Sequence, residues 1–220
     1  MAMHRGLTAD QRREQRRQQL IEAALDAIAE HGVRDLRVRA ISARARLNDR
    51  YFYESFADCH ELLLAAFDSQ FNRALTGIME VVAASPRELK ARVRAVIEFA
   101  FVFVDEDPRR ARLLTELQTA EALAGRRDEV VDVLTRVMVG QVRTLLGEAA
   151  GSEDTVELTA LTVVSGLLDL AAQWYRRRID VDRPQLVEFM TALVVTTTGI
   201  TGSLEQQLAT PDEGESGPGR

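Results

Sequence analysis

Residues 32–64 are the segment that most constrains the fold of this chain. The segment reads GVRDLRVRAISARARLNDRYFYESFADCHELLL and contains two short helical patterns joined by a tight turn, followed by the start of a longer helix. Val38, Ile41 and Ala45 mark the buried face of the first pattern, and Asn48 is a favourable N-cap for the second. A short helix pair that presents polar and aromatic side chains fits a groove, so the segment indicates a DNA-binding unit.

Helix-forming residues and capping signals continue along the chain and predict an all-α fold of about nine helices. Thr8 and Gln11 form a capping-box pattern, and Gly32 supplies a stop for the first helix. We expect the helices at about residues 9–31, 38–45, 49–56 and 58–84, from Ser85-Pro86, from Asp107-Pro108, and at about 125–147, 152–178 and 182–208.

The charge of the chain is unevenly distributed. The net charge is −6, yet residues 1–60 hold 11 Arg against nine acidic residues and carry +2, so the rest of the chain carries −8. An acidic body repels DNA, and only the N-terminal end can approach phosphates. Arg12, Arg13, Arg16 and Arg17 either clamp phosphates or form a solvated face.

Localisation signals favour the cytoplasm. The start of the chain lacks the apolar stretch of a signal peptide, and the charge-free stretch 189–204 is shorter than the roughly 18 apolar residues that span a membrane. The single cysteine, Cys59, excludes an internal disulfide and fits a reducing compartment. Cys59 is either a passive residue or a redox sensor at a helix start.

The N-terminal pattern resembles the TetR (tetracycline-repressor-like) family of transcriptional regulators. The resemblance is specific over about residues 15–67, under a third of the chain. It implies a helix-turn-helix domain over 1–57, with 1–8 disordered, a ligand-binding and dimerisation domain over 58–208, and a disordered tail over 209–220. The residues in register are Ala23, Ala24, Gly32, Val38, Ile41, Ala45, Leu47, Tyr53, Phe56, Leu62 and Leu63.

Several positions depart from the family pattern inside this segment. Arg46 stands where the turn usually has Gly, and an Arg at positive φ costs about 1 kcal/mol or more, so the turn is a candidate for a different shape. Leu36-Arg37 replaces the usual N-capping Ser or Thr of the second helix. The remaining departures are Arg50, Tyr51, Ser55 and Cys59.

The resemblance and the helix-start positions together give a set of DNA-contacting candidates. The family position of Tyr53 implies a hydroxyl that donates to phosphate, and the alternative is a ring packed between helices. Arg39 either reaches a guanine edge or lies on a solvated surface. Asp49 either meets bases or complements the helix dipole. The full set is Arg37, Arg39, Asn48, Asp49, Arg50, Tyr51, Tyr53 and Ser55.

Aromatic and long apolar side chains gather in the second half of the sequence. They favour either an ordinary core or an apolar pocket with a few polar groups, which would suit a hydrophobic small ligand. Phe99, Phe101 and Phe103 are spaced by two, so they cannot share one face of a helix. The pocket candidates are Phe67, Phe71, Phe99, Phe103, Gln118, Met138, Gln141 and Trp174.

The functional hypothesis is a homodimeric repressor that binds a palindromic operator and leaves it when a small hydrophobic ligand binds. The helices around 153–178 and 182–208 are rich in Leu, Val, Thr and Gly, and they predict either a dimer interface or burial within one subunit. The alternative function is a ligand-sensing helical adaptor with weak or no specific DNA binding. The sequence holds no nucleophile elbow, phosphate loop, metal-ligand pattern or cofactor motif, so we expect neither an enzyme nor a cofactor.

Overall fold

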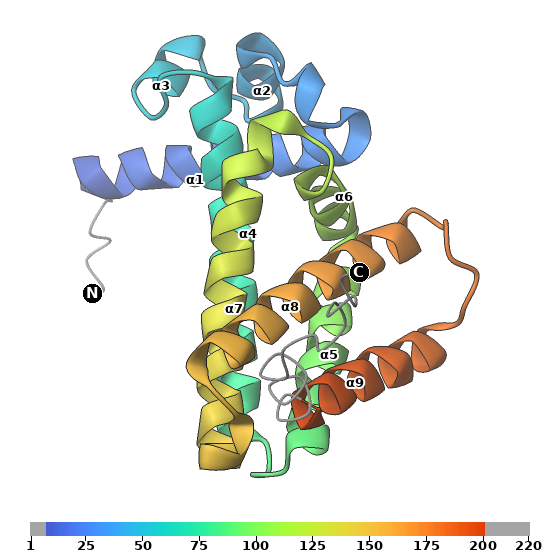
Figure 1. Ribbon diagram of the computed structural model, residues 1–220. Helices are drawn as coiled ribbons and strands as arrows, with labels where there is room; N and C mark the ends of the chain where they lie inside the picture. Colours follow the sequence, from blue (N-terminus) through green and yellow to red (C-terminus); the bar gives the residue numbers. More distant parts are fainter. Residues whose placement is uncertain (1–7, 201–220) are drawn as a thin grey trace, which may run out of the picture.

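The computed structural model describes residues 8–200, and this part of the chain is all-α, as predicted (Figure 1). Nine α-helices are joined by short turns and three 3-10 segments within these residues. The helices are α1 (Ala9–His31), α2 (Val38–Arg44), α3 (Asp49–Tyr53), α4 (Cys59–Ala84), α5 (Leu89–Asp105), α6 (Pro108–Leu117), α7 (Ala124–Leu146), α8 (Glu153–Tyr175) and α9 (Arg183–Gly199).

The N-terminal unit consists of α1, α2 and α3 packed on the first turns of α4 (Figure 1). Thr8 and Gln11 close a capping box at the start of α1, and Gly32, at a φ of 81°, ends the helix. Phe52 and Phe56 are fully buried against Leu20 and Ile41, so a small apolar core fixes the relative positions of the helices.

The turn between α2 and α3 keeps a left-handed residue although the sequence offers no glycine there. Arg46 has a φ of 56°, the Arg46 amide donates to the Ala43 carbonyl, and the Leu47 amide donates to the Ser42 carbonyl. The alternative of a differently shaped turn is therefore wrong. Two backbone hydrogen bonds and the half-buried Leu47 hold the strained conformation, which costs about 1–2 kcal/mol.

The larger unit is a bundle in which α4 to α9 surround an apolar interior. α4 runs from the N-terminal unit to the far end of the bundle, with α5 and α7 beside it, while α8 and α9 cross on one side (Figure 1). α6 lies between the N-terminal unit and the body, because it packs against α1 as well as α5, α7 and α8. α4 and α6 are thus the helices that belong to both units.

Helix boundaries differ from the predictions at three places. α5 begins at Leu89 rather than after Ser85-Pro86, because the Ser85 hydroxyl donates back to the Val81 carbonyl and ends α4 instead of capping the next helix. α3 ends at Tyr53 rather than near residue 56, because the chain bends to bury Phe56. α8 ends at Tyr175, since Arg177 adopts a φ of 57°. Of the tails predicted to be disordered, 1–8 and 209–220, the structure describes only Thr8, which is ordered as the N-cap of α1; the other residues and the predicted end of α9 lie outside the described residues.

Candidate DNA-binding surface and ligand cavity

The outer face of α2 and α3 is polar and aromatic. Tyr53 is 62% exposed and Tyr51 37%, and Arg39 and Arg50 also lie on the surface. The Tyr53 ring makes only an edge contact with Phe52, 5.4 Å between centroids, so its hydroxyl is available to an external acceptor. The interpretation of Tyr53 as a ring packed between helices is therefore wrong.

Local contacts account for the residues at the start of α3. The Asn48 side chain accepts a hydrogen bond from the Arg50 amide at 2.9 Å and caps the helix as predicted. Asp49 is half-buried in the first turn, where its charge complements the helix dipole. The Arg50 side chain is 83% exposed and pairs only with Glu54, 3.1 Å away, so a phosphate can displace this weak partner.

Arg37 and Ser55 are less suited to DNA contact than the exposed residues of α3. The Arg37 guanidinium donates to the carbonyls of Leu36 and Arg34 at 2.8 and 2.9 Å, and α2 has no side-chain cap, as expected from Leu36-Arg37. The Ser55 hydroxyl is buried and has no hydrogen-bond partner among the described residues. Arg37 is exposed but its guanidinium is held by backbone carbonyls, and the Ser55 hydroxyl is buried.

The basic side chains of α1 hold the end of α3, which the sequence did not indicate. Arg13 donates to the Glu54 carbonyl at 2.7 Å, and Arg17 donates to the Ser55 carbonyl at 3.1 Å. Arg16 lies over the Tyr51 ring, 4.5 Å from its centroid, and Arg17 over the Phe56 ring at 4.3 Å. These arginines satisfy carbonyl groups that a helix end leaves free, and they brace the short α3.

Cys59 opens α4 but is not an activated thiol. Burial raises the pKa of the Cys59 thiol, and the neighbouring Asp58 carboxylate raises this pKa further. A thiol with a raised pKa holds less of the reactive thiolate at neutral pH. This favours the passive interpretation of Cys59 over the redox sensor.

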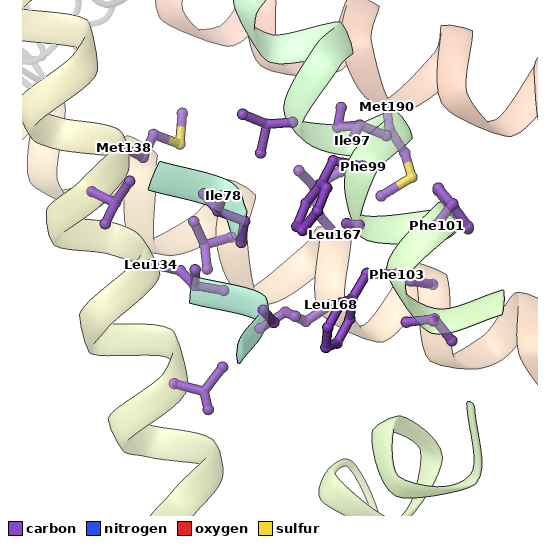
Figure 2. Close-up of a pocket in the computed structure, with 18 of the residues that line it drawn as sticks. Ile78, Ile97, Phe99, Phe101, Phe103, Leu134, Met138, Leu167, Leu168 and Met190 are labelled. Carbon is purple, nitrogen blue, oxygen red and sulfur yellow. The ribbon is translucent and has the colours of Figure 1, made fainter. Parts of the chain in front are cut away.

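A cavity of about 340 Å³ lies within the body and is lined by residues from all of α4 to α9. Its volume falls in the range of roughly 300–1,000 Å³ that is typical of small-molecule sites. Phe99 and Phe103 point into the space between α5, α4 and α7, where they face Leu134 and Met138 (Figure 2). The lining is almost entirely apolar, so the cavity suits a hydrophobic chain.

Six of the eight predicted pocket residues line this cavity, and Gln118 and Trp174 do not. Gln118 is the C-terminal cap of α6, where the helix leaves the wall. Trp174 packs against Phe101 on the opposite side of α5, and its indole N–H donates to the Val181 carbonyl at 2.8 Å. The predicted lining residues that are present are Phe67, Phe71, Phe99, Phe103, Met138 and Gln141.

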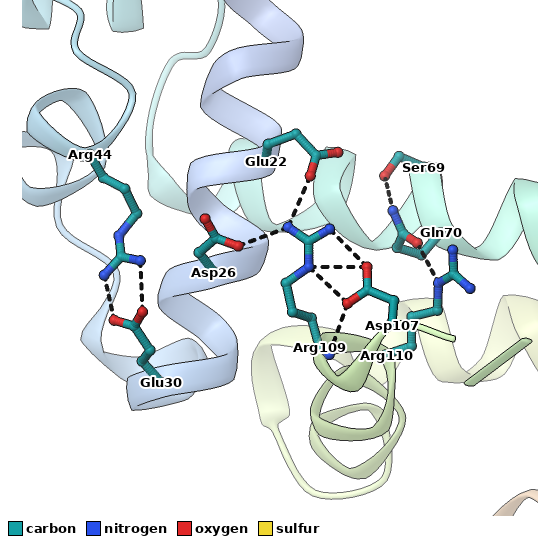
Figure 3. Close-up of polar contacts among 9 residues, drawn as sticks. All are labelled: Glu22, Asp26, Glu30, Arg44, Ser69, Gln70, Asp107, Arg109 and Arg110. Carbon is teal, nitrogen blue, oxygen red and sulfur yellow. Dashed lines mark hydrogen bonds and ion pairs between the residues drawn. The ribbon is translucent and has the colours of Figure 1, made fainter. Parts of the chain in front are cut away.

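Two arginines interrupt the apolar lining, and the sequence analysis missed both. Arg110 donates to the Gln70 side chain at 3.0 Å and to the Phe103 carbonyl, and its guanidinium lies 3.8 Å from the Phe103 ring centroid (Figure 3). Arg92 is buried and donates to the Gln141 side chain at 2.8 Å. A charged residue in a helical pattern usually indicates an exposed face. Nothing in the sequence pattern distinguishes Arg92 and Arg110 from the exposed arginines.

An ion cluster joins the body to the DNA-binding unit. Arg109 on α6 donates to Glu22 at 2.9 Å and Asp26 at 2.8 Å on α1, and it also bonds to Asp107 (Figure 3). The hydrogen bonds from Arg109 hold the pKa of the Asp107 carboxyl below its ordinary value, and Asp107 also caps α6. The cluster is polar, partly exposed and directional, so it fixes the angle at which α6 meets α1.

The described residues hold no cluster of metal ligands, and one of their helices is apolar enough to deserve a check as a membrane span. No group of three or more His, Cys, Asp or Glu lies close enough there to hold a metal ion. α8 is the one described helix that is long and apolar enough to cross a membrane by length and composition. Its Val156, Ala160, Val163 and Val164 are buried, so one face of α8 packs against the body.

Comparison with known proteins agrees with the helix-turn-helix geometry. Residues 20–66 match the sequence profile of the family described as bacterial regulatory proteins, tetR family. The N-terminal unit of the chain is therefore that of the TetR family of transcriptional regulators. The match covers α2, α3 and the parts of α1 and α4 that pack on them, which is the unit that carries Tyr53 and Arg50.

Similarity to the TetR-family relatives extends beyond that unit. The chain is 25% identical over 179 residues to the HTH-type transcriptional activator FasR of Mycolicibacterium smegmatis, over 80% of each protein. A transcriptional regulator from Pseudomonas aeruginosa PAO1 superposes with a TM-score of 0.71 and 23% identity, over 86% of this chain and 94% of that one. The FadR regulator of Bacillus subtilis, solved in complex with stearoyl-CoA, superposes with a TM-score of 0.65 and 20% identity, over 84% and 96%. These relatives are regulators rather than enzymes.

Proposed function

We propose that this protein is a cytoplasmic repressor that binds a palindromic operator as a homodimer and leaves it when a small hydrophobic ligand fills the cavity. One observation carries the proposal: α4 and α6 line the cavity and also pack against α1 of the DNA-binding unit. A ligand that moves either helix therefore acts directly on the DNA-binding unit. No separate linker is needed for the coupling.

The contacts at α6 suggest how the ligand signal travels. Arg110 touches the cavity through Phe103 and Gln70, while the adjacent Arg109 holds Glu22 and Asp26 of α1. A ligand that displaces Phe103 would shift the first turn of α6 and change the angle of α1. The ligand must bind the DNA-incompetent conformation more tightly than the competent one, because only this difference in affinity can shift the equilibrium.

An apolar surface on α8 and α9 supports the homodimer. Leu158 is 63% exposed and Phe189 56%, and Leu161 and Leu193 are also exposed. Exposed apolar side chains on two neighbouring helices favour a symmetric interface in which two helices from each subunit pair. Replacement of Phe189 by Asp would bury a charge at that interface and should convert the dimer to monomer in sedimentation, whereas Met79→Asp on α4 should leave the dimer intact.

The DNA contacts are assigned to the exposed face of α2 and α3. Each α3 would enter a major groove, with Arg50 and the Tyr53 hydroxyl on phosphates and Arg39 near a base edge. In a twofold dimer the two α3 helices read related half-sites, so the operator should be palindromic. Asn48 and Asp49 serve mainly to form the start of α3.

The ligand class is inferred from the cavity and from one relative. The cavity is mostly apolar and is lined largely by Phe, Leu, Met and Val side chains. The Bacillus subtilis FadR structure was solved with stearoyl-CoA, a molecule with a long acyl chain. We therefore propose that an acyl-type chain occupies the cavity of this protein.

A gel shift against the DNA upstream of the protein's own gene tests the proposal. We expect specific, salt-sensitive binding to a palindrome and its release by long-chain apolar compounds. Absence of specific binding to any palindrome there would favour the ligand-sensing adaptor. The adaptor also predicts that Arg50→Ala and Tyr53→Phe leave the DNA affinity unchanged.

A transcriptional activator is a second candidate, favoured by the 25% identity to FasR. In vitro transcription from the bound promoter separates the two roles. A repressor lowers transcript yield when it binds, and an activator raises it. Ligand should reverse either effect.

A further inference from the structure

Arg92 is a buried positive charge without an anionic partner. The residue is 8% exposed, and its guanidinium donates to two neutral groups, the Gln141 side chain at 2.8 Å and the Ser85 carbonyl at 3.3 Å. Its Nε atom is buried and has no hydrogen-bond partner, and Arg92 forms no ion pair with the carboxylates of residues 8–200. Burial of an unpaired charge is costly, so this site is incomplete as it stands.

The position of Arg92 relates it to the cavity. Arg92 lines the cavity together with Gln141 at the end of α5 that lies far from the DNA-binding unit (Figure 1). Phe103 lies 11 residues further along α5, which corresponds to about 16 Å of helix, and Arg110 of α6 packs on its ring. The wall between them is apolar, and Val96, Phe99 and Met138 belong to it. The cavity thus has an apolar wall with an arginine near each end, and of the two Arg110 also pairs with Glu106 whereas Arg92 has no ion pair within residues 8–200.

We infer that Arg92 binds the carboxylate of an unesterified long-chain acid, whose hydrocarbon chain extends along α5 towards Phe103. A carboxylate would supply the missing anion at the part of the Arg92 guanidinium that lines the cavity. Only a compact head group can reach a guanidinium that is 8% exposed, so the large nucleotide head of an acyl thioester is excluded from this end. The inference rests on the proposed ligand-binding function of the cavity and adds the chemistry of the ligand's head group.

The first test compares ligands that share one hydrocarbon chain and differ only in the head group. Dodecanoic acid, 1-dodecanol, dodecylamine and dodecanoyl-CoA are titrated into the full-length protein by calorimetry at neutral pH. We expect dodecanoic acid to bind about tenfold or more tightly than 1-dodecanol, which is the ratio that one charge-assisted hydrogen bond provides, and dodecylamine to bind worst. Equal affinity for the acid and the alcohol would overturn the inference.

The second test removes the charge. In Arg92→Met, which keeps a long apolar side chain, the affinity for dodecanoic acid should fall at least tenfold, and the affinity for 1-dodecanol should stay within about twofold. Arg94→Met is the matched control, because Arg94 lies on the same helix but is exposed and paired with Glu98 and Glu188, so it should bind both compounds like the parent. Unchanged affinity for dodecanoic acid in Arg92→Met would overturn the inference. If this variant folds poorly, the comparison of the four compounds on the parent protein still tests it.

The outcomes separate this inference from the proposed function. Tight binding of 1-dodecanol or dodecanoyl-CoA with no dependence on Arg92, and no preference for the acid, would overturn the carboxylate site and leave the ligand cavity in place. Failure of all four compounds to bind would overturn both.

Discussion

Arg109 and Arg110 are consecutive residues, yet their guanidinium groups bind different units of the molecule. Arg109 donates to Asp26 on α1 at 2.8 Å, and Arg110 donates to Gln70 on the cavity wall at 3.0 Å. The first turn of α6 therefore connects the cavity to the DNA-binding unit through two covalently linked residues. This connection is short and polar, and each half can be removed by a single substitution.

Replacement of Arg109 by Gln should uncouple the two units. The substitution leaves Glu22, Asp26 and Asp107 close together without their cation, so we expect a loss of about 1–3 kcal/mol in the free energy of unfolding. Ligand should still bind but should change DNA affinity less than in the parent. Fluorescence anisotropy with and without ligand measures this, and Arg127→Gln, at an exposed pair on α7, is the control.

The stability that Asp107 contributes should disappear in acid. Because Arg109 lowers the pKa of Asp107 below its ordinary value of 3.8, the contribution is complete above about pH 4 and is lost as pH falls through the lower pKa of the folded state. Asp107→Asn keeps the capping oxygen and removes the charge. We expect this variant to be about 1–2 kcal/mol less stable than the parent at pH 7. In urea titrations at descending pH, the unfolding free energies of the parent and the Asp107→Asn variant should converge. A difference in stability that stays constant with pH would contradict the role given to Asp107.

Arg46→Gly should stabilise the DNA-binding unit. Arg46 has a φ of 56°, a conformation that glycine adopts without the steric cost of a Cβ. The greater freedom of glycine in the unfolded chain offsets part of the gain, so we expect about 0.5–1 kcal/mol in chemical denaturation. Arg46→Ala retains the Cβ and should show no such gain, which separates backbone strain from the loss of the arginine side chain.

Gly77→Ala should destabilise the body although alanine favours helices. A Cβ at Gly77 would lie 2.1 Å from the Cζ atom of Phe99, so the ring would have to move. We expect a net loss of about 1–3 kcal/mol by thermal or urea unfolding. Gly140→Ala on α7 meets no atom within 4 Å and should gain up to about 1 kcal/mol, as helix propensity alone predicts.

Arg50→Ala and Tyr53→Phe should weaken DNA binding without loss of stability. Both side chains are exposed, and the only ion pair that Arg50 forms within residues 8–200 is with Glu54 on the surface. Each substitution should reduce operator affinity several-fold, and Arg50→Ala should lower the slope of affinity against salt by about one. Arg94→Ala, far from the DNA-binding unit, should bind operator like the parent.

The fold could be predicted from the sequence where the signals are local. Thr8 with Gln11, Asn48 and Asp107-Pro108 open helices as predicted, because an N-cap is formed within one turn. Ser85-Pro86 misled the prediction, because the same residue types also end helices, and only the bond from the Ser85 hydroxyl to Val81 decides between the two.

The cavity could be predicted only in part. Phe99 and Phe103 were expected in the pocket and line it. Trp174 was expected there too but packs against Phe101, because its position depends on how α8 and α9 cross α5. The burial of Arg92 and Arg110 was not predictable, because their partners Gln141 and Gln70 lie 49 and 40 residues away in sequence. Long-range pairs of this kind have no periodic signature.

The arginines of α1 that brace α3 have a consequence for the energetics of binding. Arg13 and Arg17 already hold backbone carbonyls of the protein, so they are not free to neutralise DNA phosphates without first loosening α3. Fewer condensed cations would then leave the DNA on complex formation than the count of N-terminal arginines suggests. A regulator built in this way would still lose operator affinity as salt rises, but with a shallower slope than its N-terminal arginines alone would give.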